Sequence, residues 1–78
     1  MASVMEMKGW QERIRELRED HDLTQRDVAA LLGTTQQVYS RYEQGVNELP
    51  IRHLITLCKY YKVDSDYVLG LSEKQANK

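Results

Sequence analysis

The chain has 78 residues, of which 41% are hydrophobic and 29% are charged; this composition excludes a disordered chain, and we expect one small globular domain without a second. The formal net charge is -1, from 11 basic and 12 acidic residues, so the basic balance typical of nucleic-acid-binding domains is missing. No apolar run approaches the ~18 residues of a membrane span and no secretory leader is recognisable, so we expect a cytoplasmic protein without a membrane partner.

Residues that support metal, redox or catalytic chemistry are few. One cysteine, Cys58, and two histidines, His21 and His53, provide neither an internal disulfide nor a metal-ligand spacing. We interpret Cys58 as a small core residue and His53 as a surface or boundary residue. Helix capping explains Asp64 and Asp66 better than a cation site does. With no convergent acid, base and nucleophile, we expect neither an enzyme nor a cofactor.

The first helical pattern follows residues 1–8, which are predicted to be a disordered N-terminal segment. Trp10, Ile14 and Leu17 recur at the spacing of one buried face, which predicts a helix from about residue 9 to residue 21. The polar residues between them are assigned to a solvated face: Gln11, Glu12, Arg13, Arg15, Glu16 and Glu19.

A second helix is predicted to begin at Gln25. Thr24 can cap it, and the carboxylate of Asp27 lies at the positive end of the helix dipole. Gly33 can adopt the left-handed conformation that ends a helix. An apolar stripe between these limits is the expected core face: Val28, Ala29, Leu31 and Leu32.

A third helix follows almost at once, because Thr35 can cap it and Gly45 can end it. Tyr39 and Tyr42 share one face and are predicted to turn inward. The opposite face consists of amides, hydroxyls and one guanidinium: Thr35, Gln36, Gln37, Ser40, Arg41 and Gln44. Such a strip suits base edges, since glutamine can bond adenine and arginine can bond guanine through two hydrogen bonds each.

Two further helices complete the predicted domain. Pro50 is placed at the first position of a fourth helix. Its expected core face contains the apolar residues Ile51, Leu54, Leu57, Cys58 and Tyr61. Ser65 is predicted to cap a fifth helix of about Asp66 to Leu71, and residues 72–78 are predicted to be a polar tail.

The stretch LTQRDVAALLGTTQQVYSRYEQG resembles the helix-turn-helix of the Cro/repressor type, the XRE family of bacterial and phage transcription regulators. Its GTTQQ matches the start of the recognition helix in a lambdoid phage repressor, and the similarity extends through VDSDYVLGL to cover roughly residues 10–71. The resemblance implies an all-α, compact, five-helix lambda-repressor-like domain over residues 9–71. The helix-turn-helix would be its second and third helices.

The resemblance also implies a sequence-specific transcription regulator, expected to be a repressor, that reads the major groove of double-stranded DNA. The implied base-reading residues are Thr35, Gln36, Gln37, Ser40 and Arg41. The implied phosphate contacts are Thr24, Gln25 and Gln44. Arg41 stands where the close lambdoid relative has glutamine, so that relative's operator sequence does not transfer whole. Arg18 and Glu43 match residues that form an ion pair in the family.

One helix reads only a few base pairs, so we expect a homodimer on a pseudo-palindromic operator. Its interface is expected at the loop before Pro50 and in the last helix, through Tyr67, Val68, Leu69 and Leu71. No small-molecule ligand is indicated. The alternative class is an antitoxin that neutralises a toxin and autoregulates its operon, although the chain has only short ends with which to grip a toxin.

Overall fold

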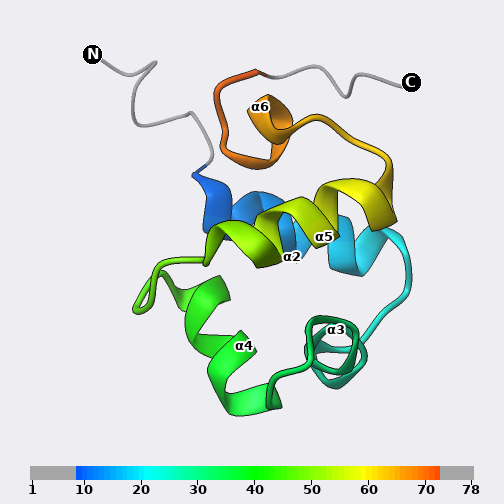
Figure 1. Ribbon diagram of the computed structural model, residues 1–78, viewed down its shortest axis with the longest axis vertical. Coiled ribbons are helices and arrows are strands. Elements are labelled where there is room, and N and C mark those ends of the chain that lie inside the picture. Colours follow the sequence, from blue (N-terminus) through cyan, green and yellow to red (C-terminus); the bar gives the residue numbers. More distant parts are fainter. Residues whose placement is uncertain (1–8, 73–78) are drawn as a thin grey trace.

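The computed structural model describes residues 9–72. Within this range the chain forms five helices and no strand, labelled as in Figure 1: α2 (Trp10–Asp20), α3 (Gln25–Leu32), α4 (Gln36–Gln44), α5 (Ile51–Tyr61) and α6 (Ser65–Val68). The all-α prediction is therefore confirmed. The predicted disordered segment and residues 73–78 of the predicted tail lie outside the described range. No described helix has the length and apolar character that crossing a membrane requires.

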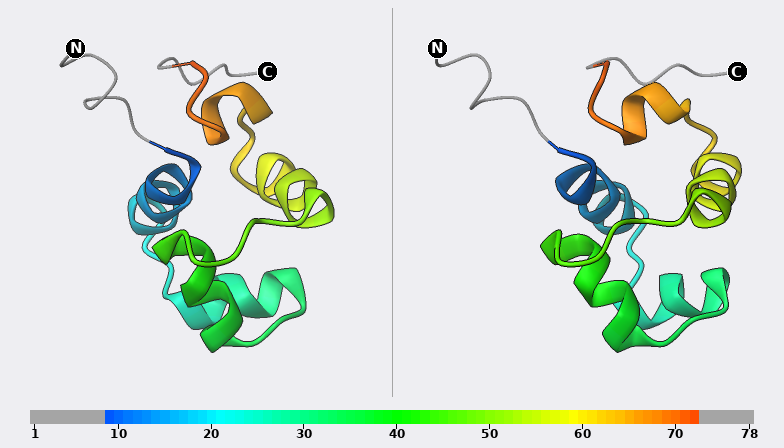
Figure 2. Two further views of the ribbon diagram at one scale, coloured as in Figure 1. Left: turned by 90° about the vertical axis from the view of Figure 1, so that its left-hand side faces the viewer. Right: turned by 60° about the vertical axis from the view of Figure 1, so that its left-hand side comes forward.

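Helix α2 is the central element of the packing. It contacts α4 on one side and α6 on the other, while α3 and α4 pack against each other at one end of the molecule (Figures 1 and 2). The buried hydrophobic residues form one cluster: Ile14, Leu17, Val28, Ala29, Leu32, Tyr39, Tyr42, Leu57, Tyr61, Val63, Tyr67 and Val68. Every helix contributes to this cluster, so the buried sides of α3 and α4 pack against a core that α2, α5 and α6 share.

The limits of α3 and α4 follow the predicted capping residues. The Thr24 hydroxyl accepts a hydrogen bond from the Asp27 amide at 3.0 Å, and the Thr24 amide donates to the Asp27 carboxylate at 2.9 Å. The Thr35 hydroxyl accepts an amide hydrogen bond in the first turn of α4 at 3.2 Å. Gly33 and Gly45 end the two helices with φ of 72° and 76°. These are local interactions, which explains why the sequence predicted them.

Two polar residues that were predicted to be at the surface are buried. Arg13, assigned to a solvated face, is 2% exposed, and its guanidinium lies 4.2 Å from the centroid of the Tyr67 ring. His53 is also buried, with its ring 5.9 Å from that of Tyr42. Both predictions were wrong because the covering rings come from distant parts of the chain, α6 over α2 and α4 over α5.

Two apolar residues assigned to the core are instead exposed. Leu31 is 39% exposed, and Ile51 is 74% exposed. Each lies roughly a third of a turn from the centre of its helix's buried face, which on α5 is defined by His53, Leu57 and Tyr61. The apolar pattern of these helices is wider than the face that the fold covers.

The boundaries of the last two helices also differ from the prediction. Pro50 is the extended residue before α5 and not its first helical residue. Helix α6 begins at Ser65 and ends at Val68, so Asp64 holds the capping position that had been assigned to Ser65. The Asp64 side chain makes no capping hydrogen bond. A four-residue helix with so weak a local signal depends on its contacts with α2 and α5.

The predicted dimer segment is divided between core and surface. Tyr67 and Val68 are buried within the monomer, so the prediction that they face a second subunit was wrong. Leu69 is partly accessible and Leu71 is 70% exposed. The core absorbs the first two residues because α6 packs directly on α2.

Candidate functional site

One side of α4 is polar and accessible, and we call it the α4 polar face. Gln36, Gln37, Arg41 and Gln44 are exposed and Ser40 is half-buried; these five residues line one shallow hollow. Thr35, which caps the helix, is also exposed. No described residue covers this face. Apart from the hydrogen bond between Gln44 and Ser40, its side-chain groups therefore remain available for an external partner.

The opposite side of α4 is aromatic, and its burial determines how α4 is rotated about its own axis. The rings of Tyr39 and Tyr42 meet edge to face with centroids 6.2 Å apart, and both side chains are buried. The Tyr39 hydroxyl is buried without a hydrogen bond of normal geometry. Burial, and next the neighbouring Glu43 carboxylate, raise the pKa of Tyr39 far above its ordinary value. The inward tyrosines that the sequence predicted thus set which residues face outward.

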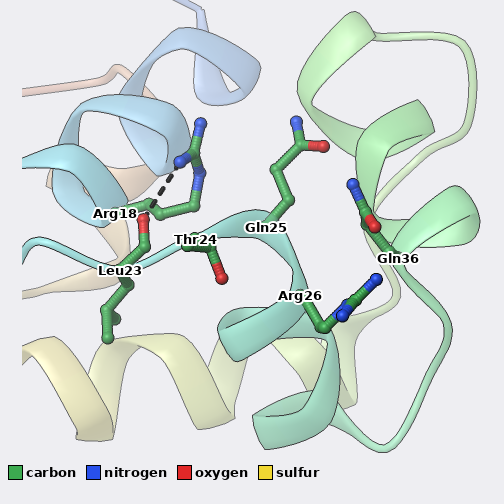
Figure 3. A pocket seen from close by; sticks show the side chains of 6 residues that line it. All are labelled: Arg18, Leu23, Thr24, Gln25, Arg26 and Gln36. Atoms are coloured by element: carbon green, nitrogen blue, oxygen red, sulfur yellow. Dashed lines mark hydrogen bonds between the residues drawn. The ribbon is translucent and has the colours of Figure 1, made fainter.

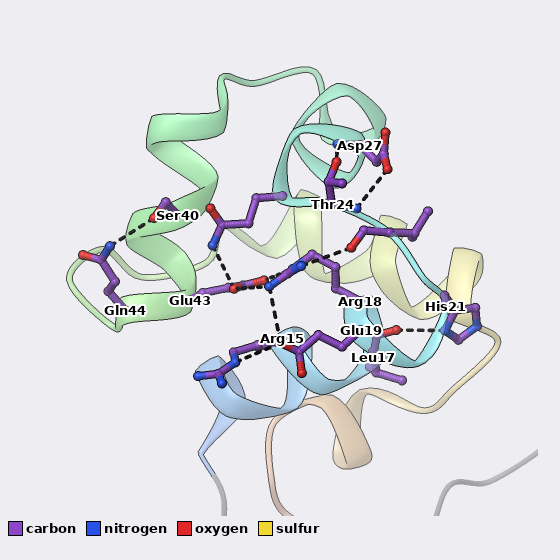
Figure 4. A network of polar contacts seen from close by, with 12 residues as sticks. Arg15, Leu17, Arg18, Glu19, His21, Thr24, Asp27, Ser40, Glu43 and Gln44 are labelled. Atoms are coloured by element: carbon purple, nitrogen blue, oxygen red, sulfur yellow. Dashed lines mark hydrogen bonds and ion pairs between the residues drawn. The ribbon is translucent and has the colours of Figure 1, made fainter.

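An ion pair joins the C-terminal turn of α4 to α2 (Figure 4). Arg18 donates from Nε to Glu43 Oε2 at 2.7 Å and from Nη2 to Glu43 Oε1 at 3.1 Å. The remaining Arg18 nitrogen, Nη1, donates to the carbonyl of Leu23 at 3.1 Å. The hydrogen bond to Glu43 raises the pKa of Arg18. One guanidinium therefore orients α4 and the turn that precedes α3.

Gln25 joins the same carboxylate from α3. Its Nε2 donates to Glu43 Oε1 at 3.0 Å. Burial raises the pKa of Glu43, but the hydrogen bonds and charge supplied mainly by Arg18 outweigh burial and hold the pKa below its ordinary value. Glu43 is therefore an ionised anchor on which α2 and α3 converge, and its position orients the α4 polar face.

A hollow of about 420 Å³ lies at the start of α3, beside the first residue of α4 (Figure 3). It is lined by Arg18, Leu23, Thr24, Gln25, Arg26 and Gln36. Two predicted phosphate contacts, Thr24 and Gln25, lie here, and the third, Gln44, lies at the far end of α4. Each is also used inside the protein, because Gln44 donates to Ser40 at 3.0 Å, Thr24 caps α3 and Gln25 bonds Glu43. Arg26 received no role from the sequence.

Comparison of the amino-acid sequence with known families gives a match to the helix-turn-helix model over residues 14–68. The HTH-type transcriptional regulator YobD of Bacillus subtilis is 36% identical over 62 residues, which cover 80% of this chain and 55% of that protein. The antitoxin PezA of Streptococcus pneumoniae is 32% identical over 57 residues, which cover 73% of this chain and 36% of that protein. The chain thus spans about half of the first relative and about a third of the second.

The fold also matches a solved DNA-binding domain. The solution structure of the DNA-binding domain of the P22 C2 repressor superposes with a TM-score of 0.73 at 25% identity. The superposition covers 88% of this chain and 93% of that domain. The five-helix arrangement expected of a lambda-repressor-like domain is therefore confirmed.

Proposed function

Because the chain belongs to the helix-turn-helix family, we propose that it binds double-stranded DNA sequence-specifically and regulates transcription as a repressor in the cytoplasm. The proposal depends chiefly on one observation, that the α4 polar face is accessible while the tyrosines on the other side of α4 are buried. In this proposal α4 enters the major groove with its N-terminal half against the base edges.

The residues of the α4 polar face define the bases that they would bind. Gln36 and Gln37 can each bond adenine through N6 and N7, and Arg41 can bond guanine through O6 and N7. Thr35 and Ser40 would add single hydrogen bonds. Ser40 is half-buried and already accepts a hydrogen bond from Gln44, so its contact is the most restricted of the five proposed base contacts. We therefore propose an operator half-site that contains both adenine and guanine.

Phosphate contacts would set the register of α4 on the duplex. Gln25 is suited to this role because its Nε2 carries two hydrogens, of which one is donated to Glu43. The second hydrogen can be donated to a phosphate oxygen, so one amide would link the DNA backbone to the anchor of α4. Thr24 and Gln44 would add neutral contacts at the two ends of the helix pair. With a net charge of -1, such an interface predicts a shallow dependence of affinity on salt.

We propose that the DNA-bound form is a homodimer with its α4 helices about 34 Å apart. The exposed apolar residues Leu69 and Leu71 support an interface at this end of the molecule. Near them a hollow of about 160 Å³ is lined by Trp10, Glu48, Leu49, Leu54 and Leu69. Sedimentation of the wild type and of Leu71→Glu, with and without operator DNA, tests this interface. An operator complex of unchanged stoichiometry and affinity in the variant would exclude Leu71 from it.

The function is tested by selecting duplexes from a random DNA pool and titrating the purified protein with the enriched sequence. We expect a pseudo-palindromic motif that is bound at least 10³-fold more tightly than random duplex. Binding of all duplexes with equal affinity, or of none, would contradict the proposal. The same titration at two salt concentrations gives the number of phosphate contacts from its slope.

The match to the antitoxin PezA favours a second candidate function, in which a toxin is bound as well as DNA. The match covers only 36% of that protein, so most of PezA lies outside the part matched by this chain. Co-expression with the product of the adjacent gene, followed by purification of one partner, separates the two functions. A stable complex that still binds DNA would support the antitoxin reading.

A further inference from the structure

The arginines near the α3–α4 pair differ in how their charges are used. Arg15 donates to Glu19 at 3.3 Å, and Arg18 is committed to Glu43. Arg26 is exposed on α3 and, within residues 9–72, makes no ion pair or hydrogen bond. Its positive charge is therefore available to an external anion, unlike those of Arg15 and Arg18.

Arg26 lies next to the start of the α4 polar face. It lines the same hollow as Gln36, the first residue of α4, and Figure 3 shows both side chains on the same side of this hollow. Thr24 and Gln25, the proposed phosphate contacts of α3, line the hollow as well. A phosphate that reached these two residues would come within range of the Arg26 guanidinium.

The position of Arg26 is also unfavourable for the isolated helix. Arg26 is in the first turn of α3, where the helix dipole is positive and favours acidic side chains. Asp27, the acidic residue of that turn, has its carboxylate engaged by the Thr24 amide. A residue that opposes a local preference without an internal partner is expected at a functional site, where an external partner compensates for it.

We propose that Arg26 binds a DNA phosphate beside the base pair read by Gln36 and supplies a large part of the sequence-independent affinity of this nearly neutral domain. This inference rests on the proposed function and adds a cationic contact to it. Arg26 is a second phosphate ligand of different chemistry from Gln25, because it contributes charge and therefore releases counterions.

The test compares wild type, Arg26→Gln and Arg26→Lys on the selected operator and on random duplex over a series of salt concentrations. Arg26→Gln should weaken both complexes by a similar factor, on the order of fivefold at low salt. The salt slope should fall by about 0.9 for each bound subunit. Arg26→Lys should retain the slope because it keeps the charge. Lys59→Gln is the matched control, since it removes an exposed positive charge on α5, away from the α4 polar face.

An unchanged salt slope in Arg26→Gln, or a loss equal to that of Lys59→Gln, would overturn the proposal. Weakening of the operator complex alone would also overturn it, because Arg26 would then read a base. Melting temperatures of all variants verify folding. Arg26→Lys should match the wild type, and Arg26→Gln should match or slightly exceed it, because it removes a positive charge from the first turn of α3. If the wild type prefers no duplex at all, the proposed function fails, whereas a selective wild type with an indifferent Arg26→Gln rejects only the role of Arg26.

Discussion

Arg18 and Glu43 lie 25 positions apart in the chain and form an ion pair with two hydrogen bonds. The Glu43 side chain is 4% exposed and that of Arg18 is 13% exposed, so solvent screens the pair only weakly. Because Arg18 is on α2 and Glu43 is in the last turn of α4, the pair sets the orientation of α4 relative to the rest of the core. The ion pair therefore stabilises the free protein, independently of any partner that α4 contacts.

Glu43→Gln should lower the free energy of unfolding by about 2–3 kcal/mol, since it leaves the weakly exposed Arg18 guanidinium with only the exposed Glu19 carboxylate, 3.9 Å away, as a counter-charge. Urea denaturation measures this loss. Glu19→Gln is the comparison, because the Glu19 carboxylate is 53% exposed and lies 3.3 Å from Arg15 and 3.9 Å from Arg18, so it removes an exposed partner of the same guanidinium. That substitution should cost under about 1 kcal/mol. Equal losses in the two variants would show that burial of Glu43 gives no additional stability.

The same pair predicts a pH dependence. The pKa of Glu43 in the folded protein lies below its ordinary value of 4.5, so the stability that it contributes is complete above that value and is lost as the pH falls through the folded pKa. The difference in melting temperature between the wild type and Glu43→Gln should therefore shrink on acidification below about pH 4.5. A difference that stays constant down to about pH 3 would contradict the lowered pKa of Glu43 in the folded protein.

Gln36→Ala tests base reading. The variant should bind the operator roughly 5- to 150-fold more weakly, which corresponds to the ~1–3 kcal/mol of one bidentate contact. Its melting temperature should be unchanged because Gln36 is exposed. Replacing the contacted adenine in the operator should weaken the wild type but not the variant. A matching loss of melting temperature would instead assign Gln36 a role in folding.

Gln25→Ala tests the linking amide of α3. Affinity for operator and for random duplex should fall by similar factors, because a phosphate contact carries no sequence information. Stability should fall by about 1 kcal/mol, since Glu43 loses the hydrogen bond from Gln25. A loss confined to the operator would refute the phosphate contact, and unchanged stability would show that the bond to Glu43 contributes nothing.

Tyr39→Phe removes a buried hydroxyl that lacks a hydrogen bond of normal geometry. At neutral pH its free energy of unfolding should lie within about 1 kcal/mol of the wild type. The raised pKa of Tyr39 means that the wild type loses stability as the pH rises above the ordinary value of 10.0, because the unfolded chain ionises first. Above about pH 10 the variant should therefore gain stability relative to the wild type, as thermal melts would show. Tyr61, whose pKa is raised to about 12, is present in both proteins and cancels in the comparison. Parallel pH curves would contradict the shift at Tyr39.

The outward side of α4 was predictable from its neighbours in sequence. Thr35 and Gly45 define where the helix begins and ends, and the inward tyrosines leave the glutamines and Arg41 outside. Arg26 could have been recognised from the same kind of pattern, as a positive charge in the first turn of a helix. The capping interactions of its neighbours Thr24 and Asp27 accounted for the start of α3, so Arg26 was assigned no role from the sequence.

The amino-acid sequence by itself determined the ends of α3 and α4, the all-helical class and the polar side of α4, because caps, left-handed glycines and helical periodicity act between residues only a few positions apart. Only the tertiary structure decided which apolar and polar side chains are covered. Arg13 is buried because Tyr67 packs on it, and Ile51 is exposed although its helix is apolar there. The hydrogen bond from Gln25 to Glu43 likewise depends on how α3 meets α4. Burial depends on which surfaces pack together from distant parts of the chain, and a pattern of neighbouring residues does not specify this packing.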